Sequence, residues 1–127
     1  MPYWQTQFGG GELSVSTLQA YLALVDRFSR VFNEARDAST IEKAYAILSA
    51  PRDGRTVDRF DQLLLTAWLN VADGAIGYDQ LVDTDGDGQA DTPFATALDQ
   101  METIRLNSSV TDAELTAQRV ILERLYR

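Results

Sequence analysis

The sequence predicts an all-α fold, a bundle of about five short amphipathic helices in a single domain that covers residues 1–127. In several segments apolar residues recur at steps of three and four, the period of a helix that buries one face. Short turns rich in Gly, Pro and Asp separate these segments, and no segment alternates as a strand does. With 45% hydrophobic residues the chain can bury one core.

The N-terminal residues 1–13 are expected to form an extended arm, because aromatic residues are followed by a run of glycines. Tyr3, Trp4 and Phe8 are its candidate anchors, either in a groove of the bundle itself or on a binding surface. The first helix is expected over about residues 16–32. Its apolar stripe consists of Leu18, Tyr21, Leu22, Val25, Phe28 and Phe32.

Two further helices are expected before residue 75. Ser39 and Glu42 have the spacing of a capping box, and Pro51 follows the helix that they would begin. The most regular apolar pattern covers residues 57–73, and Gly74 is a natural stop. The inner face of this helix is predicted to contain Phe60, Leu63, Leu64, Ala67, Trp68 and Val71.

The last two helices have clear start signals. Thr92 and Pro93 suit the N-cap and the first helical position of a helix that runs to about Leu106. Thr111 and Glu114 form a second capping box before the final helix. Its predicted inner face contains Leu115, Ile121, Leu122 and Leu125, and that of the preceding helix Phe94, Ala97, Leu98, Met101 and Ile104.

The charge balance excludes several classes of function. A net charge of −8 argues against binding to nucleic-acid phosphates and to anionic membrane surfaces. No apolar run approaches the roughly 20 residues of a membrane helix, so membrane insertion is not expected. The chain has no Cys and no His, which excludes disulfides, the usual zinc sites, thiol nucleophiles and His-based acid–base catalysis.

An enzyme is not expected, because no nucleophile motif or phosphate-binding glycine loop is present. Two carboxylate pairs occur on helical faces, Asp58 with Asp61 and Glu12 with Asp26. Such pairs are interpreted as solvated charge, since a glycosidase would need its two carboxylates across a cleft.

The stretch "DTDGDGQAD", residues 83–91, has the spacing of a calcium-binding loop. Alternate side chains supply oxygen ligands because such a loop wraps around one ion, and the glycine at the sixth position allows the sharp turn. Calcium suits this flexible oxygen set better than magnesium does, so Ca²⁺ is the expected cofactor. The predicted ligands are Asp83, Asp85 and Asp87 at positions one, three and five, the backbone carbonyl of Gln89 at seven, and Asp91 at nine.

This EF-hand-like loop departs from the pattern at its twelfth position, where Phe94 replaces the bidentate Glu. Asp79 is the candidate for an additional ligand, ahead of Asp99 and Glu102. A weak site of roughly 0.1–1 mM affinity is expected, with the ion in a structural role between two helices. An Asp- and Gly-rich turn without an ion is the alternative.

The chain also resembles a helical module found near the C-termini of secreted prokaryotic multidomain proteins. The matching pieces are Tyr3 and Trp4, "AWLNVADGA" at 67–75, "LVDTDGDGQADTPF" at 81–94, and the helix that ends near Tyr126. The resemblance implies an accessory role in an extracellular or cell-surface setting, as part of a larger secreted prokaryotic protein. A looser similarity connects the loop to dockerins, which bind a cohesin partner through paired loops. No signal peptide is recognised at Met1, as expected for an excised part of such a protein.

The expected function is a non-catalytic, calcium-stabilised accessory module for anchoring, spacing or partner binding, with a protein or glycan partner at the cell surface. One alternative is a dockerin-like protein-interaction module, which predicts that Val82 or Phe94 is exposed beside the loop. Another is a carbohydrate-binding module that uses Tyr3 and Trp4.

Overall fold

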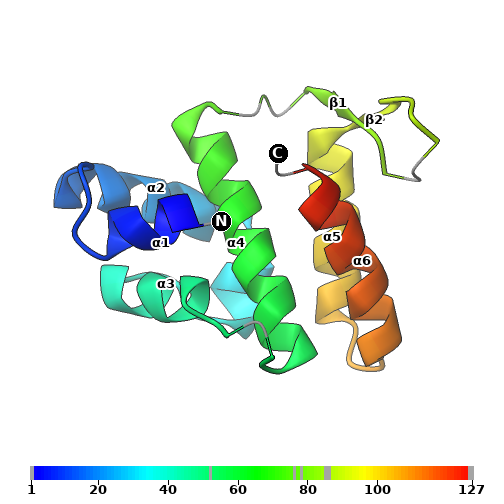
Figure 1. Ribbon diagram of the computed structural model, residues 1–127, viewed down its shortest axis with the longest axis horizontal. Coiled ribbons are helices and arrows are strands. Elements are labelled where there is room, and N and C mark those ends of the chain that lie inside the picture. Colours follow the sequence, from blue (N-terminus) through cyan, green and yellow to red (C-terminus); the bar gives the residue numbers. More distant parts are fainter. Residues whose placement is uncertain (1, 52, 76, 78, 85–86, 126–127) are drawn as a thin grey trace.

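The computed structural model describes residues 2–51, 53–75, 77, 79–84 and 87–125, and it is mostly helical (Figure 1). The predicted mainly-α character is therefore confirmed. The strands in this part of the chain are short, β1 (Leu81–Val82) and β2 (Thr92–Pro93). The helices are α1 (Pro2–Phe8), α2 (Val15–Phe28), the π-helix η1 (Val31–Ala35), α3 (Ile41–Leu48), α4 (Thr56–Asp73), α5 (Phe94–Leu106) and α6 (Asp112–Leu125).

Helix α4 is the central element of the bundle, with α1, α2 and α3 on one side and α5 and α6 on the other (Figure 1). All of residues 60–69 are buried, whichever way their side chains point. A helix that is buried all round needs partners on every face, and α2, α3 and α6 all pack against it. The polar residues among them must therefore find partners inside the protein.

The N-terminal segment differs from the extended arm expected over residues 1–13, because Pro2–Phe8 is helical. Trp4 and Phe8, one helical turn apart, are 2% and 5% exposed, so one face of α1 is fixed in the core. The indole Nε1 of Trp4 donates a hydrogen bond of 2.8 Å to Oδ1 of Asn70 on α4. Glycines then allow the chain to turn, and Gly10 has a φ of +105°.

The first long helix ends earlier than predicted, at Phe28 instead of near residue 32. Ser29 is extended, and the chain re-forms as a short π-helix that buries Phe32. The break leaves Phe28 55% exposed, although the apolar stripe predicts it inside. The helix breaks here because of a residue that is distant in sequence. The Ser29 hydroxyl and the Arg30 backbone N–H both donate to the Glu102 carboxylate on α5.

Two predicted helix ends are confirmed. Gly74 ends α4 in a left-handed conformation with a φ of +81°. Thr111 and Glu114 form the predicted capping box, since Glu114 N donates to Thr111 Oγ1 at 3.2 Å and Thr111 N donates to Glu114 Oε1 at 3.2 Å. Both signals are local, which explains why the sequence alone was sufficient to locate them.

Two predicted caps are wrong. Thr40, not Ser39, caps α3, because its Oγ1 accepts from Lys43 N at 3.2 Å. Thr92 does not cap α5; it pairs with Val82 in the β1–β2 ladder, and the helix begins at Phe94. In each case the helix starts one or two residues after the predicted position.

Most of the predicted inward faces are buried, with a few exceptions. Tyr21, Val71, Ile104 and Ile121 are only partly buried. The side chain of Leu125 lies outside the described residues. Among the described helices, none is long and apolar enough to cross a membrane.

Candidate metal centre

The two ends of the aspartate loop lie together next to the start of α5 (Figure 1). Strands β1 and β2 pair antiparallel, with Leu81 opposite Pro93 and Val82 opposite Thr92. Phe94 N also donates to the carbonyl of Gln80 at 2.8 Å. These bonds close residues 83–91 into a loop whose two ends are held side by side.

Two hydrogen bonds join described residues within the loop. Asp83 Oδ2 accepts from Gly88 N at 3.0 Å, which joins the first and sixth positions. Asp87 Oδ1 accepts from Gln89 N at 2.8 Å. Gly88 has a φ of +84°, a left-handed conformation that favours glycine at this position.

The other predicted ligands are only partly placed. Asp87, Gln89 and Asp91 are exposed, as is Asp79 in the turn before β1, whereas Asp83 is half-buried. Asp85, the ligand predicted at the third position, lies outside the described residues. Among the residues that the structure does describe, no three acidic side chains gather closely enough to hold a metal ion. The ligand set therefore stays a prediction.

The twelfth position offers the loop no oxygen side chain, because Phe94 is fully buried in the core. The two later carboxylates are engaged elsewhere. Asp99 Oδ1 lies 3.1 Å from the Arg30 guanidinium, and Glu102 is 2% exposed and faces the interior. Of the three carboxylates considered as additional ligands, Asp79 is exposed in the turn that precedes β1, and its role as a ligand stays a prediction.

Sequence reasoning missed the role of Glu102, which is a buried hydrogen-bond acceptor. Its carboxylate accepts from Trp68 Nε1 at 2.9 Å, from Arg30 N at 2.7 Å and from the Ser29 hydroxyl. It therefore joins α5 to α4 and to the link between α2 and η1. Glu102 follows Leu98 by four residues on α5, so helical spacing could have placed it on the buried face.

Asp61 is a second buried acid, and its interpretation as solvated charge is wrong. It is fully buried and accepts from Arg105 through both carboxylate oxygens, at 2.8 and 3.0 Å, and from Arg36 at 3.2 Å. Asp61 precedes Leu64 and Leu65 by three and four residues, so helical spacing could have placed it against the core.

Asp58, one turn earlier on α4, is partly exposed and extends this charge network. Arg55 and Arg36 both donate to its carboxylate, with distances of 2.9 and 2.6 Å for the closest contacts. Hydrogen bonds from Arg55 and then Arg36 hold the pKa of Asp58 below its usual value.

The surfaces that two alternative functions require are mostly buried. A dockerin-like docking face was expected to expose Val82 or Phe94, which are 7% and 0% exposed. A carbohydrate platform was expected to use Tyr3 and Trp4, but Trp4 is in the core and Tyr3 alone is half-exposed. Both hypotheses lose the support that these residues would have supplied.

The fold and the loop together define a small helical bundle whose Asp-rich loop is closed by a two-stranded ladder. No family model, curated protein or solved structure matches the chain.

Proposed function

We propose that the chain is a non-catalytic, calcium-stabilised accessory module of a larger extracellular protein, used for anchoring, spacing or partner binding. The observation that carries the proposal is the hydrogen bond from Gly88 N to the Asp83 carboxylate, within a loop closed by β1 and β2. This bond joins positions one and six of the predicted loop and curves the chain around the space where alternate ligands would meet.

The chemistry of the donor set fits a hard divalent cation. Four aspartates within nine residues repel one another unless a cation lies among them. Asp83, Asp85, Asp87, the Gln89 carbonyl and Asp91 would hold the ion, with Asp79 as an additional ligand. Bound calcium would supply charge neutralisation and would fix the connection between α4 and α5.

A structural ion is favoured over a sensor because α5 is already anchored in the bundle. Its first residue, Phe94, is fully buried; a buried hydrogen bond of Glu102 and a partly buried one of Arg105 connect the helix to α4. A helix held at its start, middle and end has little freedom to swing when calcium binds. Without a bidentate Glu the site is expected to be weak, which suits the affinity range typical of extracellular modules.

Thermal unfolding in calcium and in EDTA tests the proposal. For a site of about 0.1–1 mM affinity, about 10 mM calcium would stabilise the folded state by roughly 1.4–2.7 kcal/mol, a rise of several degrees in Tm. The double variant Asp83→Asn/Asp87→Asn should lose this rise. Asp53→Asn, the same change at an exposed turn residue between α3 and α4, should keep it. Equal Tm values in calcium and EDTA would overturn the proposal.

A further inference from the structure

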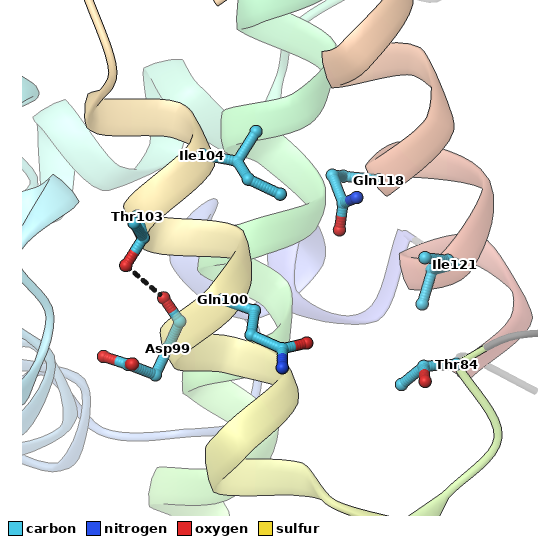
Figure 2. Close-up of a pocket in the computed structure, with 7 residues that line it drawn as sticks. All are labelled: Thr84, Asp99, Gln100, Thr103, Ile104, Gln118 and Ile121. Atoms are coloured by element: carbon cyan, nitrogen blue, oxygen red, sulfur yellow. Dashed lines mark hydrogen bonds between the residues drawn. The ribbon is translucent and has the colours of Figure 1, made fainter.

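A groove of about 440 Å³, open to solvent, lies between α5 and α6 beside the aspartate loop (Figure 2). Thr84 of the loop forms one end of it, Gln100 and Ile104 come from α5, and Gln118 and Ile121 come from α6. Its volume lies within the usual range of ligand sites, and its openness suits a chain that passes through better than an enclosed small molecule.

Some polar side chains of the groove make hydrogen bonds to described residues, and others make none. Asp99 and Thr103 are engaged at its outer edge, where both accept hydrogen bonds from Arg30, at 3.1 and 2.8 Å. The carboxamides of Gln100 and Gln118 make no hydrogen bond to any residue that the structure describes. Each carboxamide can donate and accept at once, which matches the alternating N–H and C=O groups of a peptide backbone.

Two apolar side chains also line the groove. Ile104 and Ile121 project toward the groove from the two helices, and both are partly buried (Figure 2). They offer a place for one apolar side chain next to the carboxamides. Among the described residues that line the groove there is no aromatic ring, so they offer no stacking surface of the kind that a sugar commonly uses.

We propose that this groove binds an extended segment of a partner polypeptide. Gln100 and Gln118 hydrogen-bond its backbone, and Ile104 and Ile121 receive an apolar side chain. Basic residues of the segment face the loop, because the Asp-rich loop lies at the Thr84 end and the chain carries a net charge of −8. The inference rests on the partner-binding part of the proposed function and does not require calcium.

Selection of random heptapeptides displayed on phage, against the immobilised protein, tests the proposal. The selection is run once in calcium and once in EDTA, so failure of the calcium site and failure of the groove remain distinguishable. Selected peptides should share an apolar residue near a basic one. Loss of two neutral hydrogen bonds in Gln100→Ala/Gln118→Ala should weaken their binding about tenfold or more. Gln19→Ala, an exposed glutamine on α2, is the matched control and should bind as the wild type does.

Three outcomes would overturn the groove proposal. One is the absence of enriched peptides in both buffers. Another is that the enriched peptides bind the double variant as tightly as the wild type. The last is that the double variant loses binding to oligosaccharides of a glycan array and keeps its binding to the peptides. Because neither glutamine hydrogen-bonds to a described residue, the double variant should keep the wild-type Tm; an unchanged Tm then shows that a loss of binding does not come from unfolding.

Discussion

The indole Nε1 of Trp68 lies 2.9 Å from a carboxylate oxygen of Glu102, and both side chains are buried. The same carboxylate accepts from Arg30 N and from the Ser29 hydroxyl. One acidic side chain thus accepts hydrogen bonds from three donors in two parts of the chain, α4 and the segment directly after α2.

Glu102→Ala should lower the free energy of unfolding by roughly 2–4 kcal/mol, because it leaves buried donors without an acceptor. Glu102→Gln keeps one acceptor oxygen and should cost less. Urea denaturation followed by circular dichroism measures both. Glu12→Ala, at an exposed loop residue, is the control and should change stability by no more than about 0.5 kcal/mol. Equal losses in Glu102→Ala and Glu12→Ala would contradict the role of Glu102.

Removal of the Asp61 carboxylate should be more damaging, because two arginines would lose their buried counterion. Asp61→Ala is expected to cost roughly 3–5 kcal/mol, the usual cost of breaking a buried ion pair. Asp61→Asn retains a polar partner for Arg105 and serves as the milder variant if Asp61→Ala does not fold. Urea midpoints of both, compared with Asp53→Ala, measure the effect. A loss no larger than that of Asp53→Ala would show that the network contributes nothing.

The charge network also predicts how stability depends on pH. The folded pKa of Asp58 is held below its unfolded value of about 3.9, first by Arg55 and then by Arg36. Asp58 therefore stabilises the fold above the unfolded pKa, and this contribution is lost as pH falls through the folded pKa. Urea midpoints between about pH 6 and about pH 2 should fall less steeply in Asp58→Asn than in the wild type. Arg55→Ala should give an intermediate slope. Identical slopes in wild type and Asp58→Asn would refute this assignment.

Two glycines with the same backbone conformation should give different phenotypes. Gly74 and Gly88 have φ values of +81° and +84°, and an added Cβ would meet nothing within 4 Å at either position. Substitution by Ala therefore costs backbone energy alone, about 1–2 kcal/mol. Gly74→Ala should lower stability and leave calcium affinity unchanged. Gly88→Ala should weaken calcium binding roughly tenfold, because the bound loop requires the turn at its sixth position. Equal calcium affinity in the two variants would contradict the requirement for glycine at the sixth position of the loop.

The parts of the fold that depend on neighbouring residues could be predicted from the sequence. Gly74 and the Thr111–Glu114 capping box act within one helical turn, so their spacing was sufficient. The parts that depend on distant partners could not be predicted. Phe28 follows the apolar stripe, but the helix ends there because Ser29 and Arg30 bind Glu102, more than 70 residues away.

The candidate site likewise combines features that depend on neighbouring residues with features that depend on distant ones. The spacing of the aspartates and Gly88 is a local pattern, so the calcium loop could be proposed from the sequence, and its ligand set stays a prediction. The groove between α5 and α6 depends on how two separate helices pack, and no local pattern in the sequence indicates it. The interpretation of Asp61 as solvated charge is wrong for a related reason, because its arginine partners come from distant segments.

Calorimetric titration of the metal-stripped protein with calcium measures whether the Asp-rich loop binds the ion. We expect one site with a Kd of roughly 0.1–1 mM, much weaker binding of magnesium, and no binding in Asp83→Asn/Asp87→Asn. Asp53→Asn should bind as the wild type does. Absence of a calcium-specific heat in the wild type, or an unchanged heat in the double variant, would contradict the account.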